Sequence, residues 1–139
     1  MDIVKAVASL ISEDPQEVGD YFAAVACIEH KGKWLLGLST AKDDRKGKWV
    51  FPGGGTEDGE TPEQTAKREA REETGVNVRP VGKAFERNDK PGVAFVYCKV
   101  LGNPHIKHNN EFSAMGFFSE HEMKSLELYH NVHSLIQRC

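Results

Sequence analysis

The sequence has few cysteines, no excess of positive charge and no long hydrophobic run. Its 139 residues include three widely spaced cysteines, Cys27, Cys98 and Cys139, which predict neither a disulfide framework nor a metal-binding Cys pair. Lys and Arg total 18 against 21 Asp and Glu, and this balance argues against binding extended nucleic acid or an anionic membrane by bulk charge. No apolar run approaches the roughly 20 residues of a membrane span. We therefore expect a cytoplasmic protein that lacks a secretory signal.

The composition is that of an ordinary folded domain. Hydrophobic residues make up 39% and charged residues 28% of the chain, which is enough apolar material to bury a core. Neither an internal repeat nor a Pro/Ser-rich linker divides the sequence. We expect a single domain over residues 1–139, present as a monomer or a homodimer.

Strands and helices are expected to alternate irregularly along the chain. The apolar patterns predict strands at 22–28, 34–38, 49–51, 93–100 and 112–118, pairing of 78–87 with 93–100, and helices at 2–12, 62–74 and the C-terminus. Pro52 and the glycines at 53–55 predict an unusual backbone turn after the third strand. Together these elements indicate a mixed α/β (α+β) fold with a central sheet.

The helix over 62–74 has the strongest local signals. Thr61 is a good N-cap, Pro62 suits the first helical position, and Gln64 completes a Thr-x-x-Gln capping box. Gly75 is placed to end the helix in the left-handed conformation.

Three glutamates of this helix, Glu69, Glu72 and Glu73, stand at positions i, i+3 and i+4. Residues at these spacings are neighbours, with Cβ atoms about 5–6 Å apart, so the carboxylates are expected on one helix face. Their repulsion destabilises a helix, whereas a hard divalent cation such as Mg²⁺ binds carboxylate oxygens and reverses the effect. The alternative is a solvated acidic face with Lys67 and Arg68 as counter-ions.

The residues around these glutamates form a longer pattern. The signature Gly-x5-Glu-x7-Arg-Glu-U-x-Glu-Glu-x-Gly-U, where U is a bulky aliphatic residue, is matched by Gly54, Glu60, Arg68, Glu69, Glu72, Glu73, Gly75 and Val76. The segment from 54 to 76 therefore resembles the Nudix hydrolase family of nucleotide pyrophosphohydrolases. Ala70 is smaller than the aliphatic residue usual at the first U.

The resemblance implies a fold and a chemistry. The fold is an α/β/α sandwich with a central mixed sheet, and the signature forms a loop-helix-loop motif on it. Members of this family typically use Mg²⁺ or Mn²⁺ to cleave a pyrophosphate bond in a nucleoside diphosphate linked to another group.

The resemblance also implies roles at the site. Glu72 and Glu73 look like metal ligands, and Glu69 looks like a further ligand or the base that activates water. The backbone carbonyl of Gly53 is also expected to bind metal. Many relatives use another glutamate from a late loop, which points to Glu111; the alternative is an ordinary exposed carboxylate.

Four further positions of the signature look structural. Arg68 is expected to orient the glutamates by charge-assisted hydrogen bonds, and Glu60, Gly54 and Gly75 are expected to maintain the motif.

Substrate contacts are expected near the signature. Trp49 is a candidate for stacking on a base, and Arg45, Lys48 and Arg87 are candidates for binding phosphate. The alternatives are that Trp49 is a core residue and that the basic loop before it is simply solvated.

These observations predict a metal-dependent hydrolase acting on a small nucleotide or nucleoside diphosphate derivative. A nucleoside triphosphate is slightly favoured over ADP-ribose because the chain is short. An enzyme that removes pyrophosphate from the 5′ end of RNA, and a nucleotide-sensing module without catalysis, are the alternatives.

Overall fold

The computed structural model describes residues 16–17, 20–107 and 109–139. The helix expected over 2–12 lies outside these residues. The strands are β1 (Gln16–Glu17), β2 (Ala23–His30), β3 (Lys33–Ser39), β4 (Trp49–Val50), β5 (Gly53–Gly55), β6 (Val78–Pro80), β7 (Phe85–Glu86), β8 (Val93–Val100) and β9 (Phe112–Phe118), and the helices are α2 (Pro62–Thr74), α3 (Glu120–Met123) and α4 (Val132–Arg138). None of the described helices has the length and apolar content needed to cross a membrane.

The strands form one mixed sheet, as expected from the sequence. Its order is β1-β7-β8-β2-β3-β4, with β5 paired to β2, β6 to β8 and β9 to β3. The central strands β2 and β8 are parallel, in a register that runs from Ala23 opposite Val93 to Glu29 opposite Lys99. The pairs that flank them, including β2 with β3 and β6 or β7 with β8, are antiparallel.

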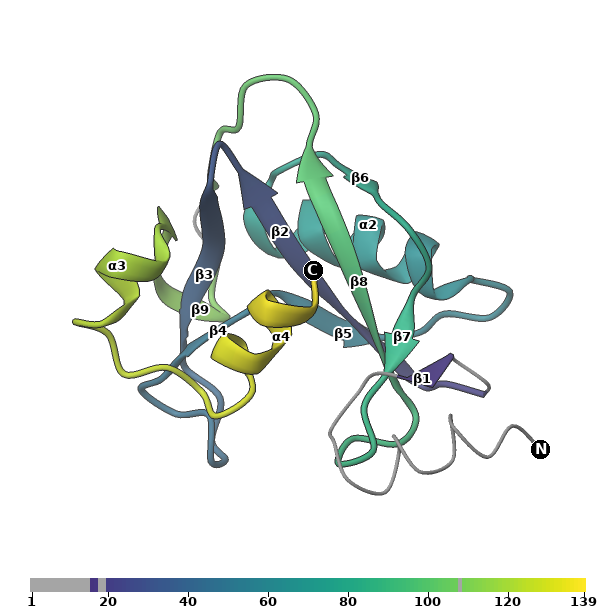
Figure 1. Ribbon diagram of the computed structural model, residues 1–139. Coiled ribbons are helices and arrows are strands. Elements are labelled where there is room, and N and C mark those ends of the chain that lie inside the picture. Colours follow the sequence, from purple (N-terminus) through teal and green to yellow (C-terminus); the bar gives the residue numbers. More distant parts are fainter. Residues whose placement is uncertain (1–15, 18–19, 108) are drawn as a thin grey trace.

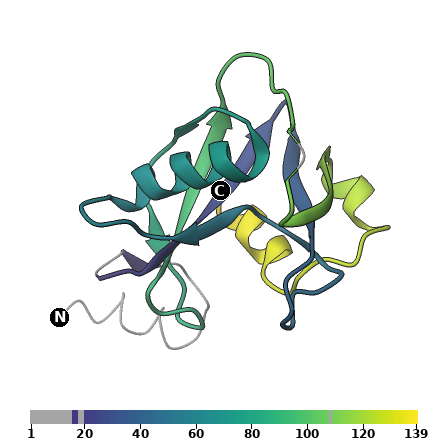
Figure 2. The ribbon, with the colours of Figure 1, turned by 180° about the vertical axis from the view of Figure 1, so that it is seen from behind.

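Helices cover both faces of the two central strands. Figure 1 shows α4 in front of β2 and β8, and Figure 2, seen from behind, shows α2 across their other face. Side chains alternate accordingly along β2, because successive residues of a strand point to opposite faces. Ala24 and Ala26 pack in the cluster that contains Ala66 of α2, whereas Cys27 packs in the cluster that contains Leu135 of α4. The fold is therefore the expected α/β/α sandwich with a mixed central sheet.

Helix α2 begins and ends at the predicted residues. Thr61 Oγ1 accepts a hydrogen bond from the Gln64 N–H at 3.2 Å, and Gln64 Oε1 accepts one from the Thr61 N–H at 2.9 Å. Gly75 adopts a φ of 79°, and its N–H donates to the Arg71 carbonyl. Local capping alone thus sets both ends of the helix that carries the three glutamates.

The glycines at 53–55 do not form the expected turn. They form β5, in which Gly53, Gly54 and Gly55 pair with Val25, Ala24 and Ala23 of β2. Glycine is needed at Gly53 for close packing, since an added Cβ would lie 2.6 Å from the carbonyl oxygen of Ala24. The short strand carries the chain directly past the face of α2 on which the glutamates lie.

The C-terminal part of the chain contains two short helices where the sequence suggested one helical region. Ser119 caps α3 through a capping box with Glu122, but α3 ends at Met123. The segment 124–131 then crosses to α4, and its Trp49–Leu128 bridge attaches it to β4.

Candidate active site

Helix α2 directs two of its three glutamates inward. Glu69 and Glu73, one turn apart, are only 9% and 6% exposed, whereas the side chain of Glu72 is 57% exposed. The three residues are thus neighbours on the helix, but the two buried carboxylates face the β5 side and Glu72 lies at the solvent edge. The buried pair forms the centre of the site.

A cavity of about 490 Å³ opens next to these carboxylates. Its wall includes Glu69 and Glu73 from α2, Gly53 and Gly54 from β5, and Glu111 from the loop before β9. Three carboxylates from two separate parts of the chain therefore face one space. Two of them lie in the signature segment, and the third is the late glutamate that the sequence singled out.

Glu73 is held between β5 and the loop before β9. Its Oε2 accepts a hydrogen bond from the Gly53 N–H at 2.9 Å, and its backbone carbonyl accepts one from the side-chain amide of Asn109. Burial, followed by the hydrogen bond and like charge of Glu111 and by the charge of Glu69, raises the pKa of Glu73 to about 10. A site that raises a carboxyl pKa in this way favours any cation that can neutralise it.

Glu69 fits into space that glycine leaves open. A Cβ at Gly54 would lie 2.5 Å from the carboxyl carbon of Glu69, so a larger residue would exclude the carboxylate from its position. Burial is the main cause that raises the pKa of Glu69, and the hydrogen bond from Arg68 opposes it. The neighbouring Glu72 charge raises it further.

Arg68 connects the glutamates to the loop that precedes α2. Its Nη1 donates to Glu69 Oε1 at 2.9 Å and to Glu72 Oε2 at 3.0 Å. Its Nε donates to Glu60 Oε2 at 2.8 Å, and its Nη2 donates to the Gly55 carbonyl at 2.7 Å. Through these bonds Arg68 and Glu60 join α2 to the loop before it.

Glu111 is positioned by its backbone. The Thr40 hydroxyl donates to the carbonyl oxygens of Asn110 and Glu111, and the Asn109 side-chain oxygen accepts from the Glu111 N–H at 2.9 Å. The same Asn109 side chain bonds the end of α2 through the carbonyl of Glu73. One amide therefore fixes the distance between the late loop and the signature helix.

The donor set fits a hard divalent cation, although the side chains do not form a complete cage. Among the described residues, no group of three acidic, His or Cys side chains is arranged to hold a metal ion as it stands. Arg68 neutralises Glu69 and Glu72 in this arrangement. Buried carboxylate oxygens beside an open cavity are nevertheless the ligands that Mg²⁺ and Mn²⁺ prefer, with water or phosphate completing the shell.

A second cavity, of about 330 Å³, adjoins the first. The two share Arg45, Val50, Phe51, Gly53 and Gly54. The second cavity extends along the α4 face of the sheet, where Val25 and Phe95 contribute apolar walls. The site is therefore an acidic compartment joined to a more apolar one.

Only some of the predicted substrate contacts line the two cavities. Arg45 lines both cavities, and its guanidinium donates to both carboxylate oxygens of Asp43. Lys48 and Trp49 line neither of them, and the Trp49 ring packs against Phe118 with centroids 5.0 Å apart. Trp49 is thus partly buried against the core, which is closer to its alternative than to a base-stacking residue.

Arg87 lines neither cavity. It is 4% exposed, and it donates to Asp89 at 2.9 Å and to Ser134 of α4 at 2.8 Å. These contacts attach the chain before β8 to α4.

Several residues of the second cavity were not singled out in the sequence. They are Asp43, Asp44, Lys90, Tyr129 and Asn131. The sequence shows a charged loop at 39–48 and a turn at 90–92. Neither segment contains a local pattern that predicts its contact with the other or with the segment before α4.

Comparison with known proteins agrees with this arrangement. A family model described as the NUDIX domain matches residues 20–139. An 8-oxo-dGTP diphosphatase from Proteus vulgaris is 43% identical over 56 residues, which are 40% of this chain and 49% of that protein. A CTP pyrophosphohydrolase from Escherichia coli (strain K12) is 45% identical over 51 residues, 37% of this chain and 38% of that protein. The matches thus span half or less of the length of these curated relatives.

Solved structures show the same fold. A NUDIX hydrolase from Nitrosomonas europaea has a TM-score of 0.67 at 20% identity, over 88% of this chain and 71% of that chain. An ADP-ribose pyrophosphatase from Streptococcus suis 89-1591 has a TM-score of 0.56 at 25% identity, over 78% of each chain. With the family model covering most of the sequence and the signature helix in place, the chain belongs to the NUDIX family.

Proposed function

We propose that this protein is a metal-dependent pyrophosphohydrolase that cleaves a pyrophosphate bond in a small nucleotide. The observation that carries the proposal is the convergence of Glu69, Glu73 and Glu111 on one cavity beside Gly53 and Gly54. A polyphosphate needs its charge neutralised, and buried carboxylates at an open cavity do this only with a bound cation. The acidic compartment is therefore the proposed phosphate site.

A nucleoside triphosphate is the favoured substrate, with ADP-ribose as the second candidate. Two relatives are described as an 8-oxo-dGTP diphosphatase and a CTP pyrophosphohydrolase, and both names specify nucleoside triphosphates. A structural neighbour is described as an ADP-ribose pyrophosphatase. The adjoining cavity of about 330 Å³ supports a nucleoside bound next to the phosphates.

Glu69, Glu72, Glu73 and the Gly53 carbonyl are the proposed ligands of Mg²⁺ or Mn²⁺. A divalent cation at this position, when bound, offsets phosphate charge and lowers the pKa of water. To join these ligands, the Glu72 carboxylate would give up its hydrogen bond with Arg68 and bind the ion instead.

The side chains around the cation have separate roles in the proposed reaction. Arg45 binds phosphate oxygens between the two cavities, because it is a lining residue of both and its guanidinium can bind an oxyanion as it now binds the Asp43 carboxylate. Glu111 or Glu69 accepts the proton of the attacking water, and the hydroxide adds to phosphorus in line with the leaving phosphate. Arg68 is a positioning residue that holds Glu69 and Glu72 by the same nitrogen.

The proposal is tested by assaying the purified chain on nucleotides, nucleotide sugars and 5′-triphosphate RNA with Mg²⁺ or Mn²⁺, and identifying products by mass. We expect a nucleoside monophosphate and pyrophosphate from a nucleoside triphosphate. Turnover that rises with RNA length would favour the RNA 5′-end activity instead. Tight nucleotide binding without any turnover would favour a sensing module.

The metal assignment is tested with Glu72→Gln. We expect kcat to fall by about 100-fold or more, because a lost ligand removes several kcal/mol of transition-state stabilisation. Since Glu72 is exposed, the melting temperature should change little. Glu63→Gln, in the first turn of the same helix, is the matched control and should keep its activity. Near-normal turnover of Glu72→Gln with Mg²⁺ would refute the assignment.

A further inference from the structure

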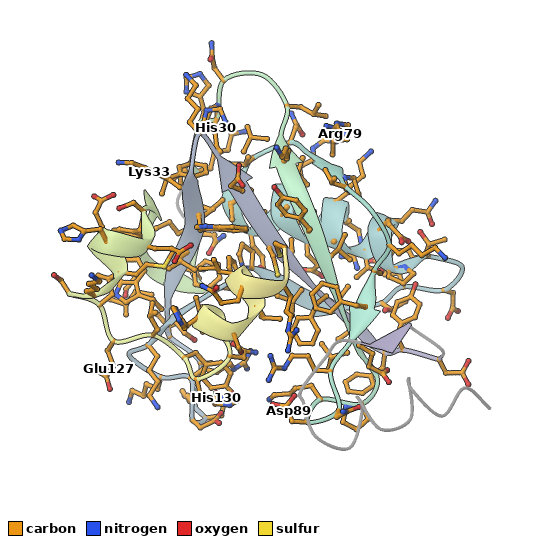
Figure 3. All side chains as sticks on the ribbon, in the orientation of Figure 1. His30, Lys33, Arg79, Asp89, Glu127 and His130 are labelled. Carbon is orange, nitrogen blue, oxygen red and sulfur yellow. The ribbon has the colours of Figure 1, made fainter. Side chains whose placement is uncertain are left out.

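The second cavity has a polar edge built from three segments. Asp44 comes from the loop before β4, Lys90 from the turn before β8, and Tyr129 from the segment before α4. Asp89 and His130, their neighbours in sequence, lie at the same end of the molecule in Figure 3. Because Phe51 and other apolar residues form the remaining wall, the cavity combines a hydrophobic surface with a polar edge, as ligand pockets commonly do.

Hydrogen bonds order the three polar groups. The Tyr129 hydroxyl donates to Asp44 Oδ2 at 3.0 Å and accepts from Lys90 Nζ at 3.3 Å. The Lys90 ammonium also lies 5.5 Å from the centre of the Tyr129 ring. Tyr129 is only 6% exposed, so it is a fixed spacer between a carboxylate on one side and an ammonium on the other.

The two ends of this edge make opposite demands on a ligand. A carboxylate only accepts hydrogen bonds, so Asp44 requires a donor opposite it. An ammonium only donates, and the bond to Tyr129 uses one of its three N–H groups, so Lys90 requires an acceptor. The edge is therefore complementary to a flat ring that carries an amino group and a carbonyl.

We propose that Asp44 and Lys90 select nucleobases that carry both an exocyclic amino group and a ring carbonyl, as cytosine and guanine do. This inference rests on the proposed nucleotide substrate. Uracil and thymine would place a carbonyl against the Asp44 carboxylate, and adenine would offer Lys90 a ring nitrogen in place of the carbonyl oxygen. Arg45, which lines both cavities, connects this base site to the phosphate site.

The selection is measured as the ratio of kcat/KM for CTP over UTP and for GTP over ATP. In the wild type we expect each ratio to be about tenfold or more, because a hydrogen bond to a charged group contributes more than a kcal/mol. Asp44→Asn supplies an amide that can donate to a carbonyl, and it should lower the CTP-over-UTP ratio most. Lys90→Met should lower the GTP-over-ATP ratio most.

Glu120→Gln and Lys124→Met, in exposed positions of α3 and just after it, are the matched controls and should keep the wild-type ratios. Equal wild-type turnover of CTP and UTP, or ratios that Asp44→Asn and Lys90→Met leave unchanged, would overturn the inference. Melting temperatures of the variants distinguish a changed preference from loss of the fold.

Equilibrium binding of CMP, GMP, UMP and AMP separates this inference from the proposed function. If no nucleotide is hydrolysed but CMP and GMP bind about tenfold more tightly than UMP and AMP, the base selection holds and the hydrolase proposal fails. If nucleotides are hydrolysed but the four monophosphates bind equally, the hydrolase proposal holds and the base selection fails.

Discussion

Gly54 and Gly55, adjacent in β5, differ in what surrounds them. An added Cβ at Gly54 would lie 2.5 Å from the carboxyl carbon of Glu69, whereas one at Gly55 would find its nearest atom, the Phe22 carbonyl oxygen, 4.0 Å away. Neither glycine has a positive φ, so backbone strain is not what requires glycine here. Glycine is instead needed at Gly54, the first glycine of the signature, because a side chain there would occupy the space of the Glu69 carboxylate.

Gly54→Ala therefore tests the position of Glu69. We expect kcat to fall by about tenfold or more, because small displacements of a reacting group are costly. Stability should fall by about 1–3 kcal/mol from overpacking. The measurements are kcat on the best substrate and the melting temperature. Gly55→Ala introduces the same methyl group into open space and should keep the wild-type melting temperature; equal behaviour of the two variants would contradict the steric argument.

At the scale of elements, those that depend on local sequence signals could be predicted, whereas those that depend on long-range pairing could not. The bounds of α2 were predictable because its N-cap, Pro62 and Gly75 all lie within the helix and its two ends. The strand at 53–55 could not be predicted, because only its pairing with β2 distinguishes it from a glycine turn. The edge formed by Asp44, Lys90 and Tyr129 was equally hidden, since its three residues are up to 85 positions apart.

The loop before α2 is attached to the helix mainly through Glu60. Its carboxylate accepts hydrogen bonds from Arg68, from the Glu57 N–H at 2.8 Å and from the Thr65 hydroxyl at 3.0 Å. These bonds, with Arg68 the largest cause, lower the pKa of Glu60 from an ordinary value of 4.5 to about 2. The folded state therefore favours the anion more than the unfolded chain does.

This shift predicts a loss of stability in acid. The contribution of Glu60 is fully present above about pH 4.5 and is lost as the pH falls toward 2, because the unfolded chain takes up the proton first. Glu60→Gln should therefore be less stable than the wild type at neutral pH, and the difference should shrink between pH 4.5 and 2. Denaturant unfolding across this range measures it. A difference that stays constant with pH would show that Glu60 acts through its shape rather than its charge.

At the scale of the whole molecule, the small net charge of −3 conceals an uneven distribution. Two buried glutamates of α2 and Glu111 face one cavity, and Arg68 directly neutralises only Glu69 of these three. Burying an acidic side chain next to another carboxylate reduces the stability of the folded state, because the buried carboxyl must take up a proton or lose its hydration as an ion. The fold thus holds Glu73 close to Glu111, and this lowers the free energy of unfolding. Because a bound cation would remove that penalty, we expect metal binding to stabilise the folded chain.

Glu73→Gln tests this coupling. Gln keeps an oxygen that can accept the Gly53 N–H bond, and it has no carboxyl group that must take up a proton to stay buried beside Glu111. Without divalent cations we expect the variant to melt roughly 3–6 °C above the wild type, because about 1 kcal/mol gained by no longer burying an ionisable carboxyl implies a shift of this size for such a domain. Excess Mg²⁺ should raise the melting temperature of the wild type and of the Glu63→Gln control but leave that of Glu73→Gln nearly unchanged. Two results would show that Glu73 is a structural hydrogen-bonding group and that the cation binds elsewhere. One is a melting temperature of Glu73→Gln below that of the wild type in EDTA, and the other is an Mg²⁺-induced rise in its melting temperature as large as that of the wild type.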